Sequence, residues 1–328
     1  MTGAPSVVVL LLATFAASAQ TYKPAGEFKL PGTSARSIAV DSVTRRLYVT
    51  SDEGVTVLNA DSGEKIGTVV FKGAQDILLV PQMNGEEKVA STIGYVSADG
   101  RVARFSLTDM KVNATARLAS SGAASMCYDE DAKSVEASSA GGGLTSISAE
   151  SGKVEKSTKL TTGSGQIACG ITGHVYVADP AANVVHVFDH ETGKNVGDWP
   201  IMTGSKPSGM SLDTKGRRLF VSCEDGTIEV IDTDSGFTFI ELKGGSGPSR
   251  SLFAWTPQGK GQWKAGSFTA SSDGTLTGVR MNAYINYTVG GTYKFTPGLN
   301  GIAYDEKTHH LYMTAMDAGA PVVIVAGY

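Results

Sequence analysis

The sequence predicts an all-β protein, a seven-bladed β-propeller of four-stranded blades in which an N-terminal strand completes the last blade. Three observations support this prediction: a strand pattern that recurs along almost the whole chain, turns of similar composition between the strands, and a repeat length that fits four short strands. The chain has 328 residues, of which 40 are glycine and 8% are aromatic. This composition suits an all-β protein with many turns.

The strand pattern is clearest between residues 45 and 63. Leu47 and Val49, and then Val55 and Val57, are apolar at alternate positions, which is the period of a strand with one buried face. Each apolar pair is followed by a turn sequence that contains Asp and Gly, and glycine adopts positive φ without steric cost. Because such a hairpin is marginally stable alone, the pattern requires neighbouring strands.

Copies of this hairpin recur through the chain, reading Ile93–Gly100, His174–Asp179, Arg218–Gly226 and His310–Ala315. The second turn recurs at Gly152, Gly193 and Gly236. Its spacing of roughly 40–45 residues is the length of a WD40-like propeller blade with four short strands. Helical repeats would instead show a 3.6-residue period.

Taken in order, the elements begin with a predicted strand at 25–30 that has no hairpin partner beside it. Seven blades follow at about 32–70, 73–112, 122–160, 163–202, 204–243, 245–289 and 296–328. The last blade has only three strands and ends at Val322–Val325. We expect the strand at 25–30 to supply the fourth, with Phe28 and Leu30 packed on that blade, because closure removes exposed sheet edges.

The innermost strand of several blades combines a small residue with a closing aspartate. The closing residues are Asp41, Asp129, Asp213 and Asp305. Small side chains suit strands that crowd around a central channel. An Asp at the end of a strand can bond the backbone of the following turn, so we expect these carboxylates to hold turns and not to bind a ligand.

The first residues resemble an export signal. Val7–Ala16 is an apolar stretch, and Ala17-Ser18-Ala19 matches a cleavage site with small residues, followed by Gln20. The stretch is too short to span a membrane. We therefore predict a signal peptide at 1–19, one propeller domain at 20–328, and a secreted or periplasmic location.

Two tetrapeptides carry a family resemblance, Tyr48-Val49-Thr50-Ser51 and Tyr176-Val177-Ala178-Asp179. They resemble the Tyr-Val-Thr-Asn signature of the secreted bacterial YVTN-repeat β-propellers, and the repeat covers nearly all of the chain after residue 19. The resemblance implies the seven-bladed fold. It does not assign one function, since proteins of one fold serve many roles.

The three cysteines, Cys127, Cys169 and Cys223, are an odd number, so at least one must remain unpaired. Cys127 aligns with Ala39 and Cys169 with Val40, so their side chains leave their strands in opposite directions. On this ground we expect no disulfide between them, and all three thiols to be reduced and shielded.

The candidate binding residues lie where the chain enters each innermost strand, because in a propeller these positions converge on one mouth of the central channel. Loops gathered on one face are a common place for ligand sites. The predicted ligand-binding residues are Arg36, Gln75, Lys206, Ser208, Arg250 and Asn300.

The remaining sequence signals exclude several functional classes. The net charge of −4 and the lack of a basic stripe argue against a nucleic acid partner. Without a nucleophile elbow, phosphate loop, haem motif or metal-binding triad, we predict no catalytic residue, no metal and no cofactor.

The sequence therefore favours a secreted, monomeric, non-enzymatic propeller that presents its loop face and channel to a protein, glycan or small ligand. Two alternatives stay open. From the resemblance, the protein could be a propeller enzyme, either a lactonase-like hydrolase or a dehydrogenase-like subunit. It could also be a structural module of the cell envelope.

Overall fold

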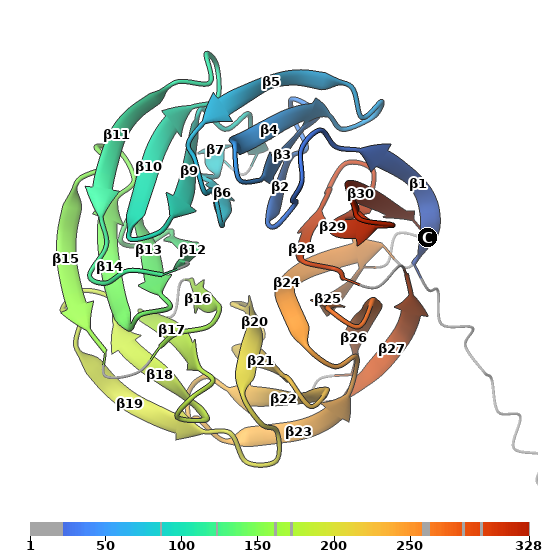
Figure 1. The fold of residues 1–328 in the computed structure, drawn as a ribbon. Coiled ribbons are helices and arrows are strands. Elements are labelled where there is room, and N and C mark those ends of the chain that lie inside the picture. Colours follow the sequence, from blue (N-terminus) through green and yellow to red (C-terminus); the bar gives the residue numbers. More distant parts are fainter. Residues whose placement is uncertain are drawn as a thin grey trace, which may run out of the picture.

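The computed structural model describes residues 22–85, 87–122, 124–160, 163–170, 173–257, 263–283, 286–295 and 298–327. Seven antiparallel four-stranded sheets are arranged in a ring (Figure 1). The predicted seven-bladed β-propeller is therefore confirmed. The predicted signal peptide and its cleavage site lie outside the described residues.

Each blade runs from an innermost to an outermost strand. Blade 1 holds β2 (Ile38–Asp41), β3 (Arg46–Thr50), β4 (Gly54–Asn59) and β5 (Lys65–Val70), and blade 2 holds β6 (Ile77–Leu79), β9 (Ile93–Ala98), β10 (Arg101–Ser106) and β11 (Val112–Arg117). Blade 3 holds β12 (Ala124–Asp129), β13 (Ser134–Ser139), β14 (Gly143–Ser148) and β15 (Val154–Lys159). A separate hairpin of β7 (Gln82–Asn84) and β8 (Glu87–Val89) interrupts blade 2.

The later blades repeat this order. Blade 4 holds β16 (Ile167–Cys169), β17 (His174–Asp179), β18 (Val184–Asp189) and β19 (Asn195–Pro200), and blade 5 holds β20 (Pro207–Asp213), β21 (Arg218–Cys223), β22 (Thr227–Asp232) and β23 (Thr238–Lys243). Blade 6 has the longer strands β24 (Pro248–Pro257), β25 (Trp263–Ser271), β26 (Thr275–Ala283) and β27 (Asn286–Lys294). Blade 7 combines β28 (Gly301–Tyr304), β29 (Leu311–Asp317), β30 (Ala320–Gly327) and β1 (Lys23–Lys29).

The ring closes as the sequence predicts. β1 pairs antiparallel with β30, and Phe28 lies opposite Val323. Phe28 and Leu30 are partly buried against the cluster that contains Val323 and Leu47. Tyr22 extends the closure to blade 6, where its ring meets that of Phe268 edge-on with centroids 5.4 Å apart.

The core lies between the blades, and every blade presents the same two faces to its neighbours. Tyr48 belongs to the face of blade 1 that packs on blade 2, which we call the forward face. Leu47 and Val49 belong to the opposite face, which packs on blade 7 and which we call the backward face. Burying one such large side chain stabilises the fold by about 1.5–3 kcal/mol. This packing explains why Tyr48 is fully buried, as are the equivalent Tyr95, Tyr176, Phe220 and Tyr312.

Blade 3 breaks this pattern, because Glu136 takes the place of the tyrosine and is only 3% exposed. Burial raises the pKa of the Glu136 carboxyl above its usual range. The hydroxyls of Tyr95 and Tyr312 donate to backbone carbonyls of the following blade. Blade 3 has no such tyrosine hydroxyl, and there the ammonium of Lys156 donates to the equivalent carbonyl of the following blade, that of His190, at 3.0 Å.

The closing aspartates hold turns, as expected. The Asp41 carboxylate accepts from the backbone amides of Val43 at 3.0 Å and Thr44 at 3.3 Å. The carboxylates of Asp129, Asp213 and Asp305 bond the following turn in the same way.

The cysteine prediction is wrong for two of the three residues. Cys127 and Cys169 form a disulfide between the innermost strands of blades 3 and 4, with Cα atoms 5.9 Å apart. Cys223 is a buried free thiol, and desolvation raises its pKa to about 12.

The reason lies in how neighbouring sheets face each other. Cys127 pairs across its sheet with Glu136 and so lies on the forward face of blade 3. Cys169 pairs with Val175 and lies on the backward face of blade 4. Two side chains that point in opposite directions cannot meet within one sheet. Cys127 and Cys169 belong to adjacent sheets, however, and the forward face of each blade packs on the backward face of the next. Their opposite directions therefore bring the two sulfur atoms together.

Peptide mapping without reductant is expected to find Cys127 linked to Cys169, and Cys223 free. A disulfide that closes a loop of this length typically contributes about 2–4 kcal/mol. The variant with both Cys127→Ala and Cys169→Ala should therefore unfold at lower denaturant concentration. Added reductant should lower the stability of the parent protein but not that of the double variant. An equal effect of reductant on both proteins would contradict the assignment.

Candidate functional site

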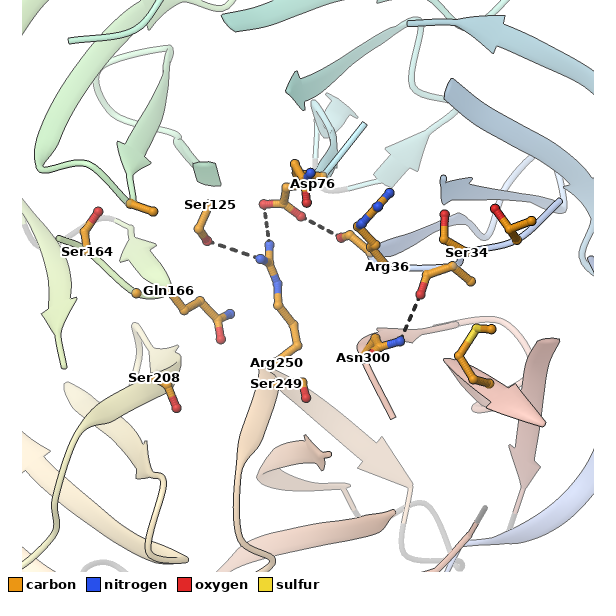
Figure 2. A pocket seen from close by; sticks show the side chains of 17 residues that line it. Ser34, Arg36, Asp76, Ser125, Ser164, Gln166, Ser208, Ser249, Arg250 and Asn300 are labelled. Atoms are coloured by element: carbon orange, nitrogen blue, oxygen red, sulfur yellow. Dashed lines mark hydrogen bonds and ion pairs between the residues drawn. The ribbon is translucent and has the colours of Figure 1, made fainter. Parts of the chain in front are cut away.

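One end of the central channel opens into a cavity of about 610 Å³ that is lined by residues from all seven blades (Figure 2). Its floor is formed around one equivalent position at the start of each innermost strand. We call the residues at this position the channel ring: Ser37, Asp76, Ser125, Gln166, Gly209, Arg250 and Gly301. Because the innermost strands converge there, residues far apart in the sequence meet.

Most of the predicted binding residues gather at this mouth. Arg36, Gln75, Ser208, Arg250 and Asn300 all line the cavity.

Lys206 is not among the lining residues. Its backbone adopts positive φ, at 55°, just before the bulge that starts β20. Its side chain is exposed and pairs with Glu224, with Nζ 3.1 Å from the carboxylate. The local turn thus directs Lys206 toward the surface and not into the channel.

Arg36 belongs to the rim of the cavity. Its guanidinium donates to the Ala74 carbonyl at 3.2 Å and forms an ion pair with Asp52. The hydrogen bond from Arg36, together with one from Ser34, lowers the pKa of the Asp52 carboxyl. Both partners are substantially exposed, and exposed pairs contribute little to stability.

Asp76 is the strongest connection between blades at the floor. It is 2% exposed. Its carboxylate accepts from the Ser37 hydroxyl of blade 1 at 2.6 Å and from the Met126 amide of blade 3 at 2.8 Å. It also accepts from Arg250 of blade 6 at 2.6 Å. One carboxylate of blade 2 therefore ties together three other blades.

Arg250 crosses the mouth to reach this carboxylate. Figure 2 shows its side chain extending from blade 6 toward Asp76 and Ser125 on the opposite wall. Besides the bond to Asp76, the guanidinium donates to the Ser125 hydroxyl at 3.2 Å. Arginine suits this role because its planar group offers several donors in fixed directions.

Gln166 plays a corresponding part for blades 4 to 6. Its side-chain oxygen accepts from the backbone amides of Met210 and Ser251, each at 2.9 Å. Its side-chain nitrogen donates to the Ser251 carbonyl at 2.8 Å. The floor is thus held by a network of hydrogen bonds between blades, which favours one rigid arrangement.

Sequence reasoning missed four polar residues of the floor: Ser37, Asp76, Ser125 and Gln166. Each directly follows a position at the start of an innermost strand, as Asp76 follows Gln75 and Gln166 follows Gly165. Extending the aligned positions by one residue would have found them. Their bonds across the channel could not be deduced, because they depend on the closed ring.

The described residues give no sign of a bound metal or a membrane span. No group of three or more His, Cys, Asp or Glu side chains among them is placed to hold a metal ion. Nor do they include a helix of the length and apolar character needed to cross a membrane.

In comparisons with known proteins, no family model and no curated protein sequence matches the chain. The fold does have relatives among solved structures. A chain in "Crystal Structure of Mitotic Checkpoint Complex" aligns with a TM-score of 0.75 and 12% sequence identity, covering 100% of this chain and 97% of that chain. Similarity at this level of identity defines the protein as a β-propeller and carries no function with it.

Proposed function

We propose that the protein is an exported, non-enzymatic interaction propeller of the YVTN-repeat type, which receives a partner molecule at the channel mouth. The observation that carries this proposal is the polar cavity to which every blade contributes. Its floor is held by bonds between blades, so the site exists before a partner arrives. Preformed sites lose less conformational freedom on binding.

Export is supported by the disulfide between Cys127 and Cys169. Disulfides persist in oxidising compartments and are rare in the cytosol of mesophiles. The apolar stretch at 7–16, followed by Ala17-Ser18-Ala19, is the second support.

Exported protein is expected to begin at or near Gln20. The cleavage pattern with small residues before Gln20 is the reason for this expectation. Intact-mass analysis of protein recovered outside the cytoplasm would measure it. A mature chain that retains Met1 would contradict the proposed export signal.

The proposed interaction face can be tested with a photo-crosslinking amino acid placed at Met316, which lines the cavity. The matched control is the same amino acid at Lys307, an exposed residue in the turn at the opposite end of the innermost strand of blade 7. Crosslinked species that form from position 316 and not from 307 would support the mouth as the binding face. Equal capture from both positions would overturn the proposal.

A further inference from the structure

The channel mouth has features that define the chemistry of what it binds. This argument rests on the proposed function, because it takes the mouth as the binding face. From Arg250 and the hydroxyls around it, we infer that the cavity binds a carboxylate whose neighbouring atoms carry hydrogen-bond donors.

Arg250 retains donors for a ligand. Of its five N–H groups, the bonds found among the described residues use one to Asp76 and one to Ser125. Its side chain is 20% exposed and lines the cavity. The guanidinium therefore has N–H groups beyond these two bonds, and a carboxylate in the cavity could accept two of them together.

The charges around the cavity disfavour a ligand with two negative charges. Of the charged lining residues, Arg36 is paired with Asp52 and Arg250 with Asp76, so each arginine already lies beside a carboxylate. A phosphate with two charges would lie close to the Asp76 carboxylate, and like charges at short range repel. A carboxylate satisfies Arg250 with less repulsion.

Hydroxyls at the rim of the cavity select the groups that lie next to the carboxylate in the ligand. The hydroxyls of Ser164 and Ser208 donate to the backbone carbonyls of Ser139 at 2.7 Å and Pro248 at 3.1 Å. Their oxygens are therefore oriented as acceptors, which suit hydroxyl or amide donors next to the carboxylate. None of the described residues that line the cavity is aromatic, so recognition depends on these hydrogen bonds and not on stacking.

Two sources could supply this chemistry: a small hydroxy acid, or the free carboxyl terminus of a polypeptide. Isothermal titration calorimetry with matched probes separates them. Glycerate is compared with glycerol, and tri-alanine with tri-alanine amide. In each pair the second compound carries a neutral group where the first has its carboxylate. Binding of glycerate but not of tri-alanine indicates a small acid, and preferential binding of tri-alanine indicates a chain terminus.

A variant pair at Ser249, which lines the cavity beside Arg250, tests the site. Ser249→Asp adds a carboxylate to the lining of the cavity and is expected to weaken binding of the preferred acid by ~10-fold or more, because like charges are brought together. In Ser249→Asn the new side chain has nearly the shape of aspartate but no charge. This variant should bind the preferred acid within ~2-fold of the parent, since neutral changes at the rim of a site cost little affinity. Lys206→Ala, outside the cavity, should have no effect.

The inference is overturned if acid and neutral probes bind the parent protein equally, if neither acid binds, or if Ser249→Asp binds as Ser249→Asn does. These outcomes leave the interaction face untouched, because crosslinking at Met316 does not depend on carboxylate recognition. Failure of that crosslinking would in turn reject the face by a measurement that uses no carboxylate probe.

Discussion

Replacing Asp76 by alanine is expected to destabilise the propeller by about 3–5 kcal/mol, the typical effect of removing one partner from a buried ion pair. The substitution leaves the largely buried guanidinium of Arg250 without its counter-charge. It also removes the acceptor of the Ser37 hydroxyl and of the Met126 amide. Because these donors belong to blades 1, 3 and 6, the loss acts on the ring as a whole.

Equilibrium denaturation of Asp76→Ala and of Asp52→Ala would measure this effect. Asp52 is a matched control, since it also pairs with an arginine of the mouth but is exposed, and exposed pairs contribute about 0–1 kcal/mol. The double variant Asp76→Asn with Arg250→Gln should recover much of the loss, because neither partner is then a buried charge. A destabilisation of Asp76→Ala no larger than that of Asp52→Ala would contradict the structural role assigned to the carboxylate.

Deleting residues 20–31 is expected to lower the melting temperature and to cause association. The deletion removes β1 and with it the ladder to β30, the contacts of Phe28 and Leu30, and the buried ring of Tyr22. Burial of one large apolar side chain contributes about 1.5–3 kcal/mol, so the combined loss should exceed the effect of a single core substitution. The bared edge of β30 then offers unpaired backbone groups to another chain.

Calorimetry and light scattering would test the deletion. Phe28→Ala and Glu27→Ala make a graded comparison, because Phe28 is partly buried on blade 7 while the neighbouring Glu27 is exposed. We expect a clear decrease in melting temperature for the first and little change for the second. If the truncated protein melted like the parent and remained monomeric, closure by β1 would not stabilise the ring.

The fold was predictable because the repeat is local. Alternation in Leu47 and Val49, followed by a turn with glycine, identifies a hairpin from a few neighbouring residues, and four more copies at blade spacing identify the ring. Closure was also predictable, since a three-stranded last blade and an unpaired first strand complement each other. The register of β1 on β30 confirms this reasoning.

The site was predictable in position but not in connectivity. Alignment of the innermost strands placed Arg36 and Asn300 at one mouth. It could not show that Arg250 reaches Asp76 across the channel, because a bond between residues 174 positions apart depends on ring size and side-chain length. The same limit explains the cysteine error: the alignment was right, but the way adjacent sheets face each other is a property of the assembled ring.

The forward and backward faces give the propeller a direction, and this has a consequence for how its blades associate. Each contact joins two different surfaces, like the head-to-tail contacts between subunits of a cyclic oligomer, which form a ring only if the rotation closes. The blades behave as covalently linked subunits of such an oligomer. We call the contact between two adjacent blades a seam. The seams differ in chemistry, since one of them holds the disulfide, and each innermost strand contributes one residue to the seam on each of its two sides.

Six pairs of residues at the other seams are equivalent to Cys127 and Cys169. They are Ala39 with Leu79, Leu78 with Tyr128, Ala168 with Leu212, Ser211 with Phe253, Leu252 with Tyr304, and Ala303 with Val40. Crosslinks introduced at these positions would lock the seams one at a time, and so measure which blade contacts open first when the ring unfolds.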